Sequence, residues 1–304
     1  GIKYNLSNFD LNKYGFNQVT SEKTMGLYQN NNASQLAILT DGIYKNIDFT
    51  VNTLDNQTSL LNALSGLNLT YFKRAPSQLF DQDAKSLNQR VAKNVSNSNK
   101  DFVTITYRVI APPHSQLYVS VPNISWSDDN NHSLSITVNG VTRNQVTDNT
   151  FDFFDLGYFE TESMVTIKLS FPGNKAISFD NPSFYALDTQ NYQIAMNTIN
   201  ERDSKVTTSN NKVFVDYSSK TNASLFFTIP YDKGWTATIN HKKVKIQRAQ
   251  KGFMKVDVPS GKGKVVLTFI PYGLKTGLLI SLLASIIFCC YAYFIRKITV
   301  IQKR

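Results

Sequence analysis

The stretch IPYDKGWTATINHKKVKIQ (residues 229–247) brings a Tyr, an Asp, a Lys, a Trp and a His together and continues into a run of cations. Asp232-Lys233-Gly234 has turn chemistry, with a Gly that is free to adopt positive φ. Tyr231 and Trp235 flank this turn as strand-end aromatics that could pack across a hairpin. We interpret the stretch as a β-hairpin with a basic edge. The functional alternative has Trp235 stacked on a sugar ring and Lys233 near a phosphate.

Alternating apolar and polar residues surround this stretch on both sides. Runs such as DFVTITYRVI, SQLYVSVP and SMVTIKLSF precede it, and KVFVDYSS, ASLFFTIP and GKVVLTFIP lie closer to it. Short period-two runs separated by Pro, Asn and Gly are typical of β-sandwiches. Aromatic residues make up 12% of the chain, which also favours strands. We therefore predict a mainly β fold with two sandwich modules of jelly-roll or immunoglobulin-like type, at residues 101–190 and 205–272.

Two segments repeat a strand, turn and strand pattern, LSITVNGVTRNQV (residues 134–146) and WTATINHKKVKIQ (residues 235–247). The turn Asn139-Gly140 is a strong hairpin signal because both residues tolerate positive φ. The turn Asn240-His241 is a weaker signal because His pays a steric cost there. The repeat supports two related sandwich modules more than it supports a shared activity.

The first 100 residues are expected to be a loop-rich lead-in that contains one helix. In LDNQTSLLNALSGL, Leu60, Leu61 and Leu64 recur at helical spacing, and Gly66 is placed to end the helix. Residues 81–100 are polar and are interpreted as a linker or a solvent-facing excursion. A short connecting helix is predicted near residues 190–205, between the two modules.

The positive charge of the chain is concentrated in the second module. The net charge is +10, and residues 205–272 contain 12 Lys and Arg residues but only three Asp residues. Lysines at a sheet edge that prevent strand pairing would explain this pattern, and so would attraction to anionic headgroups or an anionic polymer. No nucleic-acid-binding motif accompanies the charge, so nucleic acid is not an expected partner. The candidate contacts to a polymer or headgroup are Lys233, Trp235, Lys242, Lys243, Lys245 and Arg248.

The C-terminal sequence predicts a transmembrane helix at residues 275–297, followed by a cytoplasmic tail at 298–304. Residues 277–295 are apolar and uncharged over the length of a bilayer-crossing helix. Lys and Arg follow at once, which places the tail in the cytoplasm and the folded part outside. The opening GIKYNLSNFD lacks the features of a signal peptide, so we expect the chain to be the end of a longer membrane protein. A buried core helix and a sortase-anchored surface protein are the weaker alternatives.

The sequence offers little for catalysis, cofactor or metal binding. His114, His132 and His241 lie far apart, without metal-ligand spacing. Asp128-Asp129 is interpreted as a surface loop, with a sugar-contacting or cation-contacting loop as the alternative. Asp152 and Asp155 have no evident partner base. No phosphate loop, dinucleotide fingerprint or nucleophile elbow is present, so we expect no catalytic, cofactor or metal residues here.

The last third of the sequence contains a set of spaced motifs, at Pro230 to Trp235, Gly252-Phe253, Pro259 to Gly261 and Pro271 to Leu274. In these motifs it resembles the YfhO family of bacterial membrane proteins. LYVSVP, ITVNG, FFDLGYF and VTIKLSF also resemble the family's first sandwich, so the likeness covers most of residues 100–285. The sequence departs from the family at His241, where Gly is usual, and in lacking an Asn-Pro-Phe opening to the helix near residue 54.

The resemblance implies a polytopic membrane protein with a glycosyltransferase core of the GT-C type. Such proteins add sugars from polyprenyl-phosphate donors to teichoic acids outside the cell, with catalytic carboxylates on early extracytoplasmic loops. The resemblance would place those loops upstream of this chain, which would itself be non-catalytic. Its expected partners are the lipid bilayer, the upstream transmembrane core, and an anionic envelope polymer or polyprenyl-phosphate sugar. The alternative is a non-catalytic, membrane-anchored surface module that binds a glycan or an anionic polymer.

Overall fold

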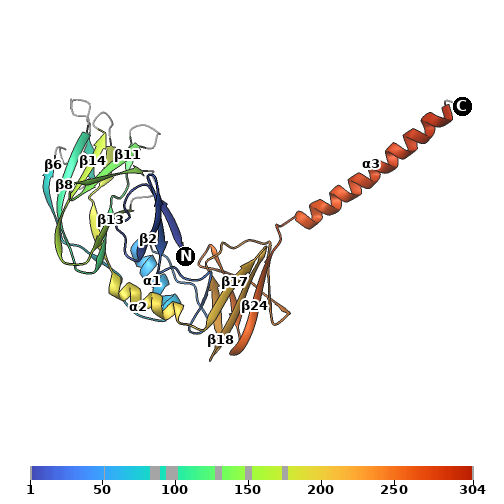
Figure 1. Cartoon of the computed structure of the whole chain (residues 1–304), viewed down its shortest axis with the longest axis horizontal. Helices are drawn as coiled ribbons and strands as arrows, with labels where there is room; N and C mark the ends of the chain where they lie inside the picture. The colour runs from blue at the N-terminus through green and yellow to red at the C-terminus, as the bar shows by residue number, and fades with distance from the viewer. Residues whose placement is uncertain are drawn as a thin grey trace. The chain divides into compact units, whose positions relative to one another are not determined.

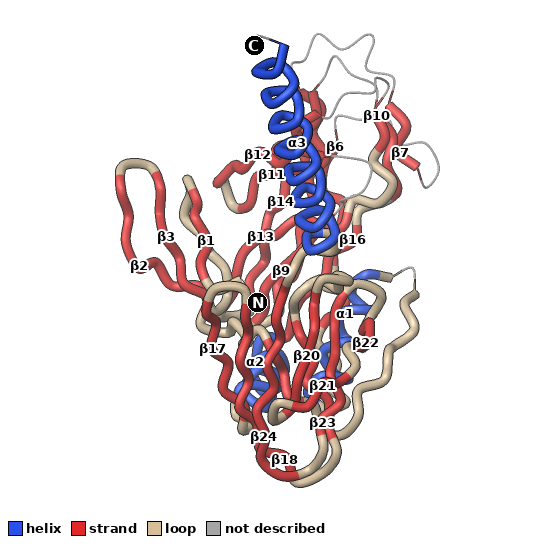
Figure 2. The backbone as a smooth tube through the Cα atoms, turned by 90° about the vertical axis from the view of Figure 1, so that its right-hand side faces the viewer, coloured by secondary structure: helices blue, strands red, loops and turns tan. Residues whose placement is uncertain are grey.

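The computed structural model describes residues 2–50, 52–82, 90–93, 102–126, 132–147, 153–172 and 177–302. The chain forms two compact units, which are drawn in Figures 1 and 2. The first unit consists of residues 1–34 and 47–200, and the second of residues 35–46 and 201–304. Each unit contains a β-sandwich, as the alternating sequence pattern predicts.

The sandwich of the first unit packs a five-stranded sheet against a four-stranded sheet, all antiparallel. The five-stranded sheet has the order β12 (Val141–Thr147), β11 (His132–Val138), β14 (Ser163–Pro172), β8 (Phe102–Ala111) and β6 (Ser77–Gln82). The four-stranded sheet has the order β13 (Phe153–Phe159), β9 (Ser115–Ser120), β16 (Ser183–Asp188) and β5 (Phe72–Arg74). Val165, Ile167 and Leu169 of β14 are fully buried in the core between the sheets, because every second side chain of a strand faces the same way.

Two smaller sheets complete the strands of the first unit. One has the order β1 (Tyr4–Ser7), β3 (Met25–Asn30) and β2 (Phe16–Glu22). The other has the order β10 (Ser125–Trp126), β15 (Ile177–Asp180) and β7 (Arg90–Lys93). The aperiodic polar sequence of the lead-in did not indicate β1 to β3. Of the predicted polar linker 81–100, residues 83–89 and 94–100 lie outside the described residues, and β7 occupies the part between them.

The two predicted helices of the first unit are confirmed. They are α1 (Thr53–Ser65) and α2 (Thr189–Asn200), which lie side by side in Figure 1. The Asn52 side chain accepts hydrogen bonds from the first-turn amides of α1, as an N-cap does. Gly66 ends α1 at φ 75°, and its amide donates to the Asn62 carbonyl. This left-handed conformation suits Gly and confirms the predicted C-cap.

The sandwich of the second unit includes a strand from the lead-in. One sheet has the order β17 (Ser204–Ser209), β18 (Lys212–Ser219), β24 (Gly261–Phe269), β20 (Trp235–Ile239) and β21 (Lys242–Val244). The other has the order β22 (Gln247–Ala249), β23 (Phe253–Val258), β19 (Ala223–Phe227) and β4 (Ala37–Leu39). The buried strand β4 pairs with β19, so residues far apart in sequence share one core.

A polar network also ties the segment after β4 to the second unit. The nearly buried Lys255 ammonium donates to the Tyr44 carbonyl at 2.8 Å and to Asp257 at 3.0 Å. Ser224 and Gln247 also donate to Asp257. Burial alone would raise the pKa of Asp257, but these hydrogen bonds and the Lys255 charge lower it below its usual value.

The predicted role of the YDKGW segment is only partly right. Asp232 and Gly234 do form a turn, in which the Asp232 carboxylate accepts from the Gly234 amide at 2.6 Å. The segment is nevertheless a crossover, not a hairpin, because β19 before it and β20 after it belong to different sheets. Gly234 is needed for space, not for positive φ, since a Cβ there would lie 2.4 Å from the Ile270 carbonyl oxygen.

The hairpins predicted at Asn139-Gly140 and Asn240-His241 are confirmed. The first turn joins β11 to β12, and the second joins β20 to β21. Within each hairpin the two strands are drawn next to each other in Figure 2. All four turn residues have positive φ, including His241 at 70°. The Asn139 and Asn240 side chains each accept a hydrogen bond from a backbone amide of the neighbouring strand. These bonds offset part of the free energy that positive φ costs in the turns.

The helix α3 (Leu274–Gln302) contains the predicted membrane span. Its segment Leu274–Ile295 has a mean hydropathy of 2.4, and none of that apolar segment is buried within the protein. It is long and apolar enough to cross a bilayer. It is the only such helix in the part of the chain that the structure describes.

Candidate functional site

The six predicted contact residues fall into two groups along the second unit. Lys233 and Trp235 lie at the start of β20, where Trp235 pairs with Phe269. The cations from Lys242 to Arg248 lie beyond the hairpin turn, where Lys242 pairs with Ile239. Lys242 is about 13 Å from Trp235 along β20, at about 3.3 Å per residue. The chain then runs back along β20, so that Val244 pairs with Ala237 and Arg248 reaches the Tyr231 ring. The structure therefore does not bring all six residues to one point.

The first group has mainly structural contacts. The Trp235 ring packs on Phe269 with centroids 4.9 Å apart, and the half-buried side chain joins the core of the second unit. The Tyr231 ring packs against the same core and lies 4.8 Å from the Arg248 guanidinium. The exposed Lys233 ammonium lies 5.7 Å from the Tyr272 ring, just before α3 begins.

The second group follows one edge of the second sandwich. Lys242 and Lys243 lie on the edge strand β21, and Arg248 lies on β22 of the other sheet. Between them, Val244 and Ile246 pack on the core. Side chains alternate along an extended chain, so Lys243 and Lys245 point outward. All four cations of this edge are exposed.

The outward side of the sheet that contains β21 carries further lysines that were not predicted from the sequence. Val213, Val215, Val265 and Leu267 are buried, so their strand neighbours face solvent. The exposed outward lysines of these strands are Lys205, Lys212, Lys243, Lys262 and Lys264, and the exposed Lys245 follows directly after β21. We call this surface of β17, β18, β24, β20 and β21 the basic face. Three of these strands, β17, β18 and β24, lie side by side in Figure 1.

Strand register arranges the basic face in rows. Lys205 and Lys264 are both cross-strand partners of Asp216. A second row contains Phe214, Val266, Thr238 and Lys243. Neighbouring strands are about 4.8 Å apart, so the cations are spread over the sheet and do not converge on one atom. Such a surface fits an extended anion better than a single phosphate.

The basic face carries little neutralising charge. Asp216 is its one carboxylate among the outward strand positions, and it lies 3.7 Å from the Lys264 ammonium. Both side chains are more than half exposed, so water and salt screen this pair strongly. The remaining lysines keep a positive field that can attract a polyanion.

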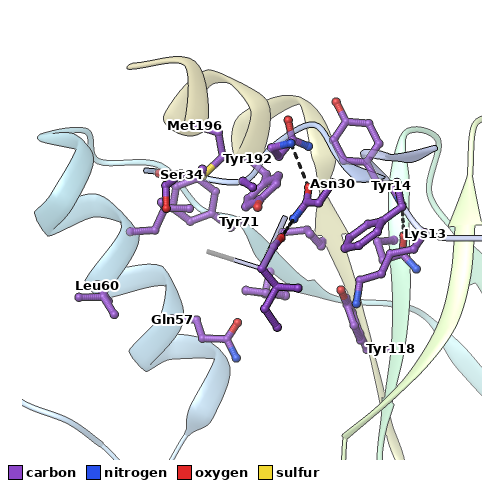
Figure 3. Close-up of a pocket in the computed structure, with 18 of the residues that line it drawn as sticks. Lys13, Tyr14, Asn30, Ser34, Gln57, Leu60, Tyr71, Tyr118, Tyr192 and Met196 are labelled. Carbon is purple, nitrogen blue, oxygen red and sulfur yellow. Dashed lines mark hydrogen bonds between the residues drawn. The ribbon is translucent and has the colours of Figure 1, made fainter. Parts of the chain in front are cut away.

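A second candidate site is a cavity of about 500 Å³ in the first unit. Figure 3 shows Leu60 and Gln57 of α1 on one side, Tyr192 and Met196 of α2 above, and Lys13 and Tyr14 on the other side. We call it the aromatic cavity because aromatic rings make up much of its wall. They are Tyr14, Phe16, Tyr71, Phe72, Tyr118 and Tyr192. No sequence pattern indicated this site.

The rim of the aromatic cavity is held by a network around Asp155. Lys13 pairs with the Asp155 carboxylate at 3.2 Å, and the buried Gln116 amide also donates to it. Gln116 in turn accepts the Tyr14 amide at 2.8 Å. A β-bulge at Gly157, with φ 110°, lets its amide donate to Asp155 as well. Asp155, which the sequence left without a partner, therefore has a structural role.

The described residues contain no group of His, Cys, Asp and Glu side chains that could hold a metal ion. His114 lies 3.2 Å from Glu160 at an exposed position. Asp128-Asp129 and Asp152 lie outside the described residues, as does the side chain of His132. The described chain thus offers two candidate binding surfaces, the basic face and the aromatic cavity.

Comparison with known proteins identifies the family. The family described as "Bacterial membrane protein YfhO" matches residues 1–281. The chain belongs to the YfhO family. This agrees with the apolar segment of α3, which is long enough to cross a bilayer, and with the motifs of residues 230–274. A YfhO relative from Bacillus subtilis (strain 168), named "Uncharacterized protein YfhO", is 26% identical over 135 residues.

That match covers 42% of this chain and only 16% of the relative. Among solved structures, a cycloisomaltooligosaccharide glucanotransferase from Paenibacillus aligns over 74% of this YfhO-family chain and 52% of its own, with 9% identity and a TM-score of 0.24. A conserved protein of unknown function from Pseudomonas aeruginosa PAO1 aligns over 66% and 92%, with 10% identity and a TM-score of 0.17. These weak similarities carry no argument about function.

Proposed function

We propose that this chain is part of a longer membrane glycosyltransferase and that its basic face holds the anionic acceptor polymer. The acceptor would be an envelope polymer such as teichoic acid, and the sugar would come from a polyprenyl-phosphate donor. Membership of the YfhO family supports the membrane setting. The Lys and Arg residues that follow the apolar span favour a cytoplasmic C-terminus, with the folded part outside the cell.

The observation that carries the proposal is the basic face itself. Five exposed lysines at outward strand positions, together with Lys245 just after β21, share one side of a single sheet with one carboxylate, over β17, β18, β24, β20 and β21. If the lysines only prevented unwanted pairing at the sheet edges, they would be needed only on the edge strands β17 and β21. Lys212, Lys262 and Lys264 lie on the inner strands β18 and β24, where edge protection does not apply. A phosphate-rich chain laid across the sheet would use them all.

In this proposal the chain supplies binding energy and no chemistry. A diffuse cationic surface raises the local concentration of a polyanion and speeds its encounter. It also tolerates different positions along the polymer, because each lysine is a flexible point charge. That property suits an acceptor with many equivalent sites. The catalytic groups would belong to the rest of the protein.

The proposal is tested by sugar transfer to the polymer in membranes that contain the full-length protein. One variant changes four face lysines, Lys212, Lys243, Lys245 and Lys264, to Gln. A matched control changes four exposed lysines elsewhere, Lys3, Lys23, Lys45 and Lys168, to Gln. At roughly 1 kcal/mol for each lysine near a phosphate-rich surface, the face variant should lose at least about tenfold in rate at limiting polymer.

The control has the same net charge and should remain within about twofold of the wild-type rate, because its lysines lie off the face. Equal rates for the wild type and the face variant would refute the proposal. An equal loss in both variants would also refute it, because net charge alone would then explain the effect.

A further inference from the structure

We propose that the aromatic cavity of the first unit binds a neutral saccharide. The inference goes beyond the proposed function, since it concerns a different unit and an uncharged ligand. It rests on the walls of the cavity, on one buried amide without a partner, and on the charge balance of the rim.

The walls of the aromatic cavity match the two kinds of surface on a sugar ring. A pyranose has C–H groups on its faces and hydroxyl groups around its rim. The cavity offers aromatic rings such as Tyr118 and Tyr192 for the faces, and side-chain amides such as Asn32 and Gln57 for the rim. Its volume of about 500 Å³ lies within the range of small-molecule sites.

Asn32 provides the sharpest indication of a ligand. Its side chain lines the cavity and is only 6% exposed. Its Nδ2 atom is the one buried side-chain polar atom without a hydrogen-bond partner among the residues that the structure describes. Buried donors are normally satisfied, and an exception calls for an explanation. A hydroxyl oxygen of a bound sugar would accept this N–H group.

Two phenol groups are also available in the cavity. No hydrogen bond to the Tyr118 or Tyr192 hydroxyl is found within the described chain, whereas Tyr14 donates to Gln193 at 3.0 Å and Tyr71 to Asn62 at 2.8 Å. Burial raises the pKa of Tyr118 and of Tyr192 above the ordinary value. Both groups therefore stay protonated and can donate to ligand oxygens.

The charge balance of the rim favours a neutral ligand. Lys13 is the one charged residue among the described residues that line the cavity. Its ammonium is paired with Asp155 at 3.2 Å, so the cation is neutralised within the protein. An anionic ligand would have to approach the Asp155 carboxylate or displace it. A saccharide without phosphate or carboxylate avoids this repulsion.

The test is ligand-detected NMR on chain 1–304 in neutral detergent micelles. The probes are the methyl glycosides of glucose, galactose and N-acetylglucosamine, with decanoate as an apolar-chain probe. At least one glycoside should give saturable magnetisation transfer at concentrations up to roughly 50 mM, which corresponds to weak binding. Binding by none of the glycosides, or by decanoate alone, would overturn the inference.

Two variants locate the binding. Asn32→Leu removes the unpartnered amide, so it should weaken glycoside binding about tenfold without lowering the unfolding temperature. A structural Asn32 would give the opposite pattern, with unchanged binding and a lower unfolding temperature. Tyr118→Phe keeps the ring and removes the hydroxyl, and should weaken binding about threefold or more. Tyr185→Phe, outside the cavity, is its control, and equal effects in the two Tyr variants would overturn the assignment.

Discussion

The basic face of the second unit and the aromatic cavity of the first are both built on antiparallel strands, but by different means. The face uses one side of one sheet, and side-chain alternation alone places its lysines there. The cavity combines two helices, strand β9 and the segment before β2, and its residues extend from position 2 to position 196. A surface built by alternation distributes its binding energy over many residues. A cavity built by convergence depends on a few.

The two surfaces therefore differ in how they should respond to change. The face needs an intact sheet but no individual lysine. The cavity needs particular groups at particular positions, such as the amide of Asn32 and the Asp155 network. Four predictions follow from this contrast, from the largest expected effect to the smallest.

The sheet that carries the basic face should be destabilised when Gly234 gains a side chain. A Cβ at Gly234 would lie 2.4 Å from the Ile270 carbonyl oxygen and 2.8 Å from the Phe269 ring, next to the start of β20. Gly234→Ala should therefore destabilise the second unit by about 3 kcal/mol. Hydrogen exchange of β20 and β24 measures the loss.

The control Gly252→Ala has open space around it and should stay within about 0.5 kcal/mol of the wild type. Equal exchange in both variants would contradict the account.

The rim of the aromatic cavity should be disturbed by a substitution at Gly157. Its φ of 110° is unfavourable for Ala, and a Cβ would lie 2.9 Å from the Asn12 side-chain nitrogen. Gly157→Ala should cost the first unit about 2 kcal/mol. It should also weaken glycoside binding, because the bulge positions Asp155.

The control for the rim is Gly140→Ala, which also has a positive φ but open space around it. It should cost about 1 kcal/mol in stability and leave glycoside binding unchanged. Calorimetric unfolding and the NMR titration together separate the two variants. Weakened glycoside binding in Gly140→Ala would show that general strain, not the rim, controls the cavity.

The second unit should lose stability in acid through Asp257. Its folded pKa lies below the ordinary 3.8, so the carboxylate contributes stability above about pH 3.8. That contribution is lost as the pH falls through the folded pKa. Asp257→Asn should cost about 1 kcal/mol at pH 7, because a third of the side chain is exposed.

Hydrogen exchange of β23 from pH 7 to pH 2 measures this effect. The wild type should approach the Asp257→Asn variant as the pH falls. Asp216→Asn is the control, since that carboxylate is more than half exposed, and it should change stability at pH 7 by less than about 0.5 kcal/mol. A constant gap between the wild type and Asp257→Asn would exclude the assigned role.

Single lysines of the basic face should have the smallest effects. Lys243→Gln should weaken polymer binding about fivefold, equivalent to about 1 kcal/mol. Its effect on stability should be within about 0.5 kcal/mol, because the side chain is exposed. Binding titrations and thermal unfolding of the same sample test both statements. Complete loss of binding from this one change would mean that the face is a convergent site, not a distributed one.

Local signals explain what the sequence predicted correctly. The helix α1 and its Gly66 cap, the Asn139-Gly140 turn and the apolar run of α3 each depend on residues within one short segment. Strand alternation in the sandwiches is equally local. These features give the fold class, the membrane segment and the basic character of the second unit.

Non-local pairing explains what the sequence missed. Strand β4 belongs to the second unit only because Ala37 to Leu39 pair with β19, almost two hundred residues away. The YDKGW segment has a turn composition in either a hairpin or a crossover, and only the sheet assignment distinguishes them. Alternation could have shown that Lys212, Lys262 and Lys264 share a face with Lys243 once the strand pairing was known. The aromatic cavity has no comparable signal.

The most direct test of the central claim is a titration of chain 1–304, in nanodiscs of neutral lipid, with poly(glycerol phosphate). The account predicts saturable binding that weakens about a hundredfold when salt is raised from about 50 to about 500 mM. The variant with Gln at Lys212, Lys243, Lys245 and Lys264 should lose at least about tenfold in affinity at low salt. The four-lysine control off the face should bind like the wild type. Binding that is insensitive to salt, or equal in the face variant and the wild type, would contradict the claim.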